Sequence, residues 1–457
     1  MRNNQIHWRD LSGEFYDGDK KTVMERPSIH SYDKTLTMKI LLSRPDLEND
    51  GESIVVCTFK RLRTFIRELD TQTKGIPKIL YLVGWQYEGH DTGYPAFFQV
   101  NSRLAEEGED ATQLLREIME ESTAYNTTVS LHINMTDAYP GNPLWNEYAE
   151  EDLISKRRSG RYLVTGCWYG RKAYQICYTR EWESGRAVDR INKLMDLLPL
   201  EKAGTVHIDA FFSRPSRFHG ISVEQEQAAR RKIIRYWRSQ GVDVTSEFIY
   251  REKGRDDLIG LVPMVWHLNQ KKKDYLNRPA RLLSGGNINK DLRGDKKLNR
   301  LFGGSTRGES HFSDKEMTAF NHRWQQPFMK DFFTNTLSWY YLNNFKRLSV
   351  DPLSRFALLD HNIRTEKKNS VIKENDSCIS YRGDLCIPAL WSKTPLLGVF
   401  SRKGTADREW ELPETWGEIK EVHYEPACVG SRKKTIPVKM RKIKISLSKG
   451  EGGWIFP

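Results

Sequence analysis

Helical and strand-like patterns of apolar residues alternate along the chain from about residue 50 to about residue 300. In the helical segments apolar residues recur every three or four positions, as Leu62, Phe65, Ile66 and Leu69 do. Each helical segment is followed by a short, almost continuous apolar run, which is typical of a strand buried on both faces. The pattern predicts helices at 59–70, 110–125, 184–200 and 222–241, and strands at 78–85, 127–135, 161–169, 205–212, 242–250 and 258–268.

This alternation predicts an α/β fold, a (β/α)8 barrel of the TIM type. Buried strands separated by amphipathic helices form parallel sheets. The number of such strands, spread over about 250 residues, favours a closed barrel over a doubly wound sheet. No GxGxxG motif follows the first strand and no GxxxxGK[ST] motif occurs, which argues against a nucleotide-binding fold.

The two ends of the chain follow other patterns. The first 50 residues contain one clear strand pattern, at 35–43, between turn-rich flanks. Residues 284–314 are charged and punctuated by glycine, as in a loop over a site or a linker, and 313–333 have a helical pattern. Short alternating runs then continue to the C-terminus. We therefore expect an N-terminal β extension at 1–50, the barrel at 51–330 and an all-β, sandwich-like C-terminal domain at 331–457.

The composition is that of a folded protein. The 457 residues include 13 Trp, 19 Tyr and 19 Phe, residue types that disordered chains avoid. No apolar run reaches the roughly 18 to 20 residues that cross a bilayer, and the first residues lack the pattern of a signal peptide. We therefore expect a cytoplasmic protein without a membrane partner. Neither a CxxC pair nor zinc-like spacing occurs, so free thiols are expected at Cys57, Cys167, Cys177, Cys378, Cys386 and Cys428.

The net charge of +12 raises the question of nucleic-acid binding. The basic clusters, however, lie on an alternating segment near the C-terminus and on the helix expected at 222–241, where they are typical of solvated faces. The sequence shows no helix-turn-helix, zinc-finger or RNP-like motif. We expect no nucleic-acid partner.

Five successive strands of the expected barrel end in, or run into, a polar or aromatic side chain. Catalytic groups of TIM barrels come from the C-terminal ends of the strands. Taken singly, each residue has a structural explanation: an aspartate can cap a helix, Glu247 can pair with Arg251, and a histidine or tryptophan can belong to the core. As a set they indicate a functional site, made of His90 with Asp91, then His132, Trp168, Asp209 and Glu247.

Asp209 and Glu247 are expected at neighbouring strand ends, and such a carboxylate pair is typical of glycoside hydrolysis. One acid protonates the leaving oxygen, and the other carboxylate acts on the anomeric carbon. An indole such as that of Trp168 stacks on a sugar ring. Two other interpretations stay open: a non-catalytic carbohydrate-binding barrel, and a metal-dependent hydrolase. The second would use His90, Asp91, His132 and His207, whose spacing matches neither HxH nor HExxH.

The segment 84–97, "GWQYEGHDTGYPAF", resembles the catalytic barrels of the endo-α-N-acetylgalactosaminidases of glycoside hydrolase family 101 and of their smaller relatives in family 129. In those barrels a strand runs into a Gly-His-Asp loop, as at 89–91 here. A strand-borne histidine, a tryptophan-bearing strand, an aspartate nucleophile and a glutamate acid/base follow. His132, Trp168, Asp209 and Glu247 match that order, and the resemblance covers residues 50–270.

The resemblance implies a retaining mechanism with Asp209 as nucleophile and Glu247 as general acid/base, their carboxyl groups about 5–5.5 Å apart. It implies that Asp91 and His132 hold sugar hydroxyls, with His90 in the same loop and Trp168 beside the sugar. We also assign Trp266 to the wall of this subsite. We expect no metal and no cofactor in the reaction. A structural calcium ion near acidic loops stays open.

The expected partner is a carbohydrate, a glycan or glycopeptide. Family 101 enzymes are usually large and secreted and release a disaccharide from mucin-type O-glycans. The shorter chain here, without an export signal, favours an exo-acting enzyme that removes terminal α-linked N-acetylgalactosamine or galactose. A sister family with another sugar specificity remains an alternative, and the sequence gives no indication of the oligomeric state.

Overall fold

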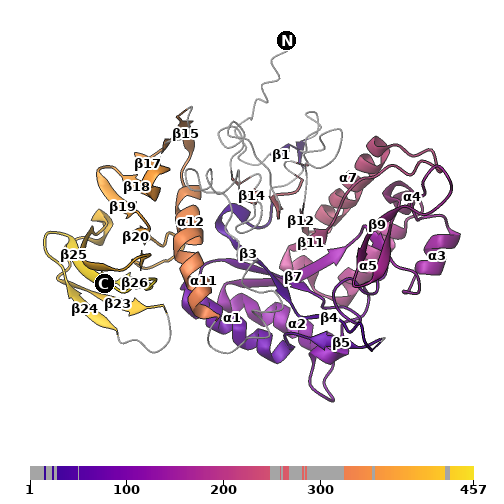
Figure 1. The fold of residues 1–457 in the computed structure, drawn as a ribbon, viewed down its shortest axis with the longest axis horizontal. Coiled ribbons are helices and arrows are strands. Elements are labelled where there is room, and N and C mark those ends of the chain that lie inside the picture. Colours follow the sequence, from indigo (N-terminus) through magenta and orange to yellow (C-terminus); the bar gives the residue numbers. More distant parts are fainter. Residues whose placement is uncertain are drawn as a thin grey trace, which may run out of the picture.

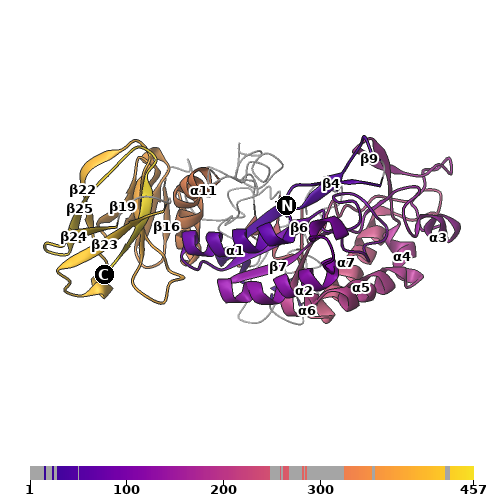
Figure 2. The same ribbon diagram turned by 90° about the horizontal axis from the view of Figure 1, so that it is seen from below.

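The fold comes from a computed structural model that describes residues 15–16, 23–24, 28–49, 51–247, 258, 261–266, 280–281, 284–285, 324–351, 356–427 and 433–457. Figure 1 shows two differently built parts. Parallel strands and their helices form one part, antiparallel strands form the other, and a helical segment lies between them. Figure 2, turned by 90°, shows the same separation.

The first part is built on seven parallel strands in the order β14-β13-β12-β11-β7-β6-β3. Neighbours in the sheet are successive strands of the barrel region, without the reversal of order that marks a doubly wound sheet. The TIM-type barrel is confirmed, with seven of its strands among the described residues. They are β3 (Leu36–Leu41), β6 (Lys78–Val83), β7 (Thr127–Asn134), β11 (Thr205–Asp209), β12 (Asp243–Ser246), β13 (Met264–Val265) and β14 (Ser284–Gly285).

Two of the predicted strands have other positions than we expected. The strand predicted at 35–43 is β3, which pairs in parallel with β6 from Leu36 to Leu41 and so opens the barrel sheet rather than lying outside it. The strand predicted at 161–169 is not a barrel strand. It forms β9 (Val164–Trp168) of a small antiparallel sheet with β8 (Asp137–Ala138) and β10 (Arg171–Gln175). Its apolar and aromatic run was mistaken for a buried strand, although much of β9 is exposed.

The four predicted helices are present, and their ends follow local capping. Thr58 accepts a hydrogen bond from the backbone N–H of Arg61, Asp110 caps the second helix, and Ser222 and Gln225 form a capping box on the fourth. They are α1 (Phe59–Thr73), α2 (Ala111–Glu121), α5 (Arg186–Leu197) and α7 (Val223–Ser239). Shorter elements are α3 (Trp145–Glu150), α4 (Tyr178–Glu183), α6 (Leu200–Ala203), η1 (Tyr32–Lys34), η2 (Ser102–Leu104), η3 (Ser122–Tyr125) and the strand pairs β1 (Phe15–Tyr16) with β2 (Val23–Met24) and β4 (Ser43–Pro45) with β5 (Ser53–Val55).

The second part is all antiparallel, as predicted. A ten-stranded sheet has the order β15-β16-β17-β18-β19-β20-β21-β26-β23-β24, and β22 pairs with β25. Trp410 of β22 and Ile443 of β25 pack with Val399, Tyr424 and Ile455 of the large sheet, so the two sheets share one apolar layer. The bounds are β15 (Arg347–Val350), β16 (Phe356–Leu359), β17 (Ile363–Glu366), η6 (Lys368–Ser370), β18 (Val371–Glu374), β19 (Ser377–Tyr381), β20 (Asp384–Pro388), β21 (Leu397–Ser401), β22 (Thr405–Glu411), η7 (Glu414–Trp416), β23 (Glu421–Pro426), β24 (Lys434–Pro437), β25 (Lys442–Leu447) and β26 (Gly452–Phe456).

A helical run joins the two parts: α11 (Gln325–Asp331), a π-helical turn η5 (Phe332–Leu337) and α12 (Ser338–Asn343). Its first part falls within the helix predicted at 313–333, and the run continues to Asn343; the first residues of the predicted helix lie outside the described ones. Phe333 packs on Phe400 and Trp454. The indole N–H groups of Trp391 and Trp454 donate to carbonyls at the C-terminal end of α1, so the two parts share one core.

Three further expectations concern the whole chain. Among the residues with a described position, no helix combines the length and the apolar character needed to cross a bilayer. Five of the cysteines are free thiols, as predicted, and Cys428 lies outside the described residues, as does most of the loop predicted at 284–314. The domain boundaries at residues 50 and 330 stay predictions, although β3 shows that the barrel sheet includes residues before position 50.

Candidate active site

Asp209 and Glu247 meet at the C-terminal ends of two adjacent strands. Asp209 is the last residue of β11, and Glu247 directly follows β12. These strands pair in parallel with Ile208 opposite Ser246, so the register brings the two acids to the same edge. One carboxylate oxygen of each lies within 4.8 Å of the other. Their side chains are 15% and 19% exposed, which leaves both accessible from the barrel mouth.

The surroundings of Glu247 favour its protonated form. Burial raises the pKa of its carboxyl group, and the charge of Asp209 and a hydrogen bond between the two side chains raise it further. The Lys39 ammonium opposes this shift: its Nζ lies 2.9 Å from Oε1 of Glu247. Glu247 therefore carries the features of a proton donor beside the carboxyl group of Asp209.

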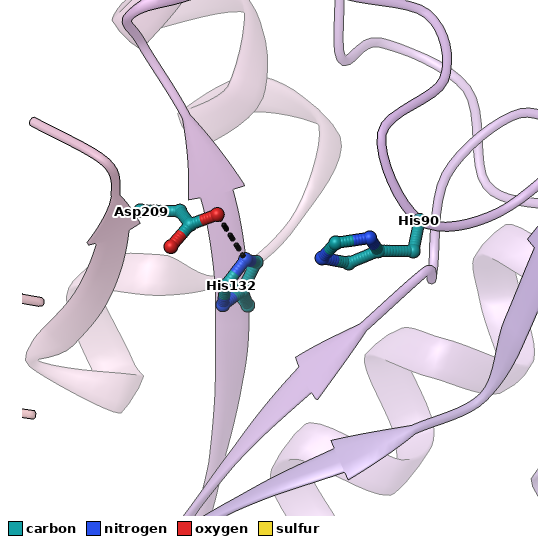
Figure 3. Close-up of side chains that lie close together, drawn as sticks. All are labelled: His90, His132 and Asp209. Atoms are coloured by element: carbon teal, nitrogen blue, oxygen red, sulfur yellow. Dashed lines mark ion pairs between the residues drawn. The ribbon is translucent and has the colours of Figure 1, made fainter. Parts of the chain in front are cut away.

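His132 lies beside Asp209 on the next strand, β7. Its Nε2 is 3.4 Å from Oδ2 of Asp209, as Figure 3 shows. Burial lowers the pKa of His132 well below its usual value, and the positive charges of Lys39 and His90 lower it further. A neutral imidazole has one N–H, and placing it on Nε2 directs it at the carboxylate. His132 can thus orient Asp209 without carrying a charge.

His90 and Asp91 reach the site from the loop after β6. The ring of His90 lies 5.4 Å from that of His132, and its Nδ1 is 3.1 Å from Oδ2 of Asp91. Burial disfavours the charged imidazole, but the charges of Asp91 and Asp209 outweigh burial and raise the pKa of His90. The imidazole of His90 and the carboxyl group of Asp91 both have the hydrogen-bonding groups that bind hydroxyls.

The shape of this loop depends on glycine at position 89. Gly89 has a φ of +119°, and a Cβ there would lie 2.7 Å from the backbone of Arg44. The next residue, His90, donates its backbone N–H to the carbonyl of Ser43 in β4 at 3.0 Å. The Gly-His-Asp sequence is therefore anchored on β4, and this anchoring directs the two side chains toward the ends of β7 and β11.

The two predicted tryptophans lie in other parts of the fold than the strand pattern predicts, while the role of Trp168 beside the sugar stays a prediction. Trp168 ends β9, on an antiparallel hairpin rather than a barrel strand, and is 49% exposed. Its neighbour Tyr169 is the aromatic residue that reaches the site, with its ring 6.0 Å from that of His90. Trp266 follows β13 and is fully buried, 5.3 Å from the ring of His207. It backs the site from inside the barrel, so our assignment to the subsite wall is wrong.

The sequence analysis missed two ionisable residues near the site, Lys39 and Asp137. Lys39 interrupts the apolar run of β3, which is a weak signal in the sequence. Asp137 is 2% exposed in β8, and Nδ2 of Asn134 donates to its Oδ2 at 2.9 Å. Burial, to which the charges of Asp91 and Asp209 add, raises the pKa of Asp137 to about 7. Only the tertiary structure brings these acids near each other.

Two sets of side chains around Asp209 have the proximity that a metal site requires. His90 and His132 form one set with Asp209, and His207 and Glu247 form the other. In the second set, Nζ of Lys39 already lies 2.9 Å from Oε1 of Glu247, and Nδ1 of His207 is hydrogen-bonded to Oγ1 of Thr245 at 2.8 Å. This second set is better suited to acid–base chemistry than to a divalent cation, because a lysine would repel the ion.

Residues 57–257 match the endo-α-N-acetylgalactosaminidase family model. This segment is therefore similar to a glycoside hydrolase domain. The match confirms the family resemblance and covers β6 to β12, including Asp91, His132, Asp209 and Glu247. This chain also has similar solved structures. The ligand-free α-N-acetylgalactosaminidase NagBb from Bifidobacterium bifidum has a TM-score of 0.54 and 11% identity. Its complex with Gal-NHAc-DNJ has a TM-score of 0.53 and 9% identity.

The first of these alignments covers 74% of this chain and 57% of the NagBb chain, and the second 75% and 57%. Our chain thus spans less than two thirds of the length of that enzyme. At such identities the likeness shows the common fold, which is the barrel found here.

Proposed function

We propose that this chain is a retaining glycoside hydrolase that removes α-linked N-acetylgalactosamine or galactose from O-glycans or related oligosaccharides. The observation that carries the proposal is the meeting of Asp209 and Glu247 at the mouth of the barrel, with oxygens within 4.8 Å. Retaining enzymes hold their carboxyl groups about 5–5.5 Å apart, and inverting enzymes about 6.5–9.5 Å apart, to admit a water. The spacing here favours the retaining arrangement.

In the first step, a carboxylate oxygen of Asp209 attacks the anomeric carbon while the bond to the leaving oxygen breaks. Glu247 gives its proton to that oxygen. The raised pKa of Glu247 supports this role, because a protonated carboxyl group is needed at the start. The N–H that His132 directs at Asp209 keeps the attacking oxygen in place.

In the second step, water attacks the same carbon and the bond to Asp209 breaks. Glu247, now ionised, takes the proton of the water, which returns both acids to their starting forms. Two displacements on one carbon preserve the anomeric configuration. The step uses only the two carboxyl groups and one water molecule, and it requires that Glu247 change from donor to acceptor.

The sugar is proposed from the match to the family model and from the fold. NagBb is an α-N-acetylgalactosaminidase, and one of its structures is a GalNAc complex with a TM-score of 0.51 to this chain. Within the site, we propose that Asp91, His90 and His132 bind the hydroxyls of the sugar in the subsite next to Asp209. Trp168, exposed beside Tyr169, remains a prediction for an indole that stacks on a sugar ring.

The test is hydrolysis of p-nitrophenyl α-GalNAc and α-Gal, with the β-linked compounds as matched controls and the first-formed anomer followed by ¹H NMR. We expect the α compounds alone to be cleaved, with the α anomer released first and mutarotation afterwards. Release of the β anomer would overturn the retaining mechanism. If neither aryl glycosides nor O-glycopeptides yield sugar, the protein is not a hydrolase of this class.

A second pair of substrates separates exo from endo action. One glycopeptide carries a single α-GalNAc on threonine, and the other carries the same sugar extended by β-linked galactose. An exo-acting enzyme cleaves the first glycopeptide and leaves the second intact, as we expect here. Release of an intact disaccharide from the second would show endo action and would leave the roles of the two carboxyl groups unchanged.

A further inference from the structure

Lys39 joins the first strand of the barrel to the proposed acid/base residue. It lies on β3, at one end of the seven-strand order, whereas Glu247 follows β12, four positions away in the sheet. The Nζ–Oε1 distance of 2.9 Å therefore spans the interior of the barrel rather than a pair of neighbouring strands. The side chain of Lys39 is 11% exposed, so its ammonium is held inside and is little screened by water.

Trp266 supports the ammonium from another side. Nζ of Lys39 lies 4.8 Å from the centroid of the indole ring, within the range of a cation–π interaction. Trp266 is fully buried and packs edge-on against His207. The cation–π contact and the ion pair together place the ammonium between the indole and Glu247.

The charges around Glu247 change during the proposed reaction. Among the described residues, those facing it are Lys39 from β3, His132 from β7, and His207 and Asp209 from β11. Before the reaction, burial and the charge of Asp209 favour a protonated Glu247, and Lys39 opposes them. Once Asp209 is esterified to the sugar its charge is gone, while that of Lys39 persists. The balance then moves toward the ionised form.

We propose that Lys39 is a positioning residue that holds Glu247 beside Asp209 and makes it a proton acceptor once the glycosyl-enzyme has formed. This inference rests on the proposed function. In the second half-reaction the water oxygen bonds to the anomeric carbon, the ester bond to Asp209 breaks, and the water proton goes to Glu247. Lys39 transfers no proton itself. It stabilises the carboxylate that receives one.

The kinetic test compares Lys39→Met, which removes the charge, with Lys39→Arg, which keeps it. Lys60→Met is the matched control, because Lys60 is exposed and pairs with Glu106 far from the site. With 2,4-dinitrophenyl α-GalNAc as substrate, the initial burst of dinitrophenol reports formation of the glycosyl-enzyme. The steady-state rate that follows reports its hydrolysis. At a pH below the pKa of Glu247, we expect for Lys39→Met an intact burst, a steady-state rate about tenfold lower and a KM that falls with kcat, because a rise of about one unit in the pKa of the acceptor lowers its ionised fraction about tenfold there.

Two further readings separate this role from structural support. The alkaline limb of kcat/KM should move up by about one pH unit in Lys39→Met and stay in place in Lys39→Arg. Azide, a nucleophile that needs no proton acceptor, should restore turnover of Lys39→Met and yield an α-glycosyl azide. Equal losses in both half-reactions, an unmoved alkaline limb or no rescue by azide would overturn the inference while the proposed function stands.

A measurement of stability tests the ion pair without relying on activity. When folding raises the pKa of a carboxyl group, that group stabilises the folded protein at pH values below its pKa in the unfolded chain. This stabilisation is lost as the pH rises through its pKa in the folded protein. Removing Lys39 raises the pKa of Glu247 further, so Lys39→Met should lower Tm more at pH 8 than at pH 5. An equal change at both pH values would overturn the ion pair. Wild-type protein without hydrolase activity would overturn the proposed function itself, and the role of Lys39 with it.

Discussion

The barrel and the antiparallel part place their charged residues in opposite ways. In β25, lysines and isoleucines alternate, so that Lys442 and Lys444 face solvent while Ile443 and Ile445 are buried. In β11, by contrast, His207 is fully buried and Asp209 stands at the strand end beside three other ionisable groups. A charge on an exposed face needs no partner, whereas a charge inside a barrel is unfavourable unless neighbours compensate it. Ionisable residues inside the barrel mouth therefore indicate a functional site, whereas the lysines of β25 indicate a solvated surface.

The largest effect is expected at the centre of the barrel mouth. Asp209→Asn should lower kcat/KM by at least about 10⁴-fold, because an amide cannot form the ester that the reaction requires. Tm should stay close to that of the wild type, since the change removes a charge and little volume. Kinetics on aryl α-glycosides measure kcat/KM, and a thermal melt measures Tm. Asp196→Asn, on the exposed end of α5, is the matched control. Near-wild-type activity of Asp209→Asn would remove it as the nucleophile.

The next effect depends on the substrate rather than on the fold. Glu247→Gln should slow the cleavage of glycopeptides by about 10²–10⁴-fold, because their leaving groups need a proton. Formation of the glycosyl-enzyme from a dinitrophenyl glycoside, whose leaving group needs none, should lose far less. Burst amplitudes on the glycopeptide and on the dinitrophenyl glycoside give the ratio of the two losses. Equal losses in this step would show that Glu247 does not act as the acid.

The third prediction uses the antiparallel part. Ile443→Ala should destabilise the protein by about 2–5 kcal/mol, because it opens a cavity between the two sheets. The kcat of the folded molecules should be unchanged. The adjacent Lys442→Ala, which removes an exposed ion pair with Glu409, should alter neither stability nor activity measurably. For both variants, denaturant unfolding measures the free energy of unfolding, and steady-state kinetics measure kcat. A large loss of kcat in Ile443→Ala would show that the two parts are coupled in function.

The smallest predicted effect is a gain in stability at alkaline pH. The pKa of Asp137 is raised to about 7 in the folded protein, so its contribution to stability is present at low pH and is lost as the pH rises through that value. Asp137→Asn should therefore raise Tm at pH 8 and change it little at pH 5. The gain is bounded by about 4 kcal/mol, and losing the carboxylate's hydrogen bonds reduces it to about 1–2 kcal/mol. A lower Tm at pH 8 would contradict the raised pKa of Asp137.

Local patterns were sufficient for the helices, for most strands and for the class of the fold. The apolar face of α1 and the Asp110 cap of α2 depend on neighbours in sequence, so periodicity and capping residues revealed them. The same reasoning failed for β9, because an aromatic run on a hairpin and a buried strand have similar composition. It also predicted Trp168 as the aromatic residue of the site, whereas the neighbouring Tyr169 is the one whose ring lies near that of His90.

The sequence by itself determined the alternation of strands and helices, the antiparallel character of the C-terminal part and the order of polar residues at the strand ends. Each of these follows from residues close in the chain. Only the tertiary structure decided that Lys39 contacts Glu247 across 208 positions, that Trp266 is buried behind them and that Asp137 lies near the site. The physical reason is that the proton affinity of a carboxyl group depends on burial and on charges a few ångströms away, and barrel closure sets both.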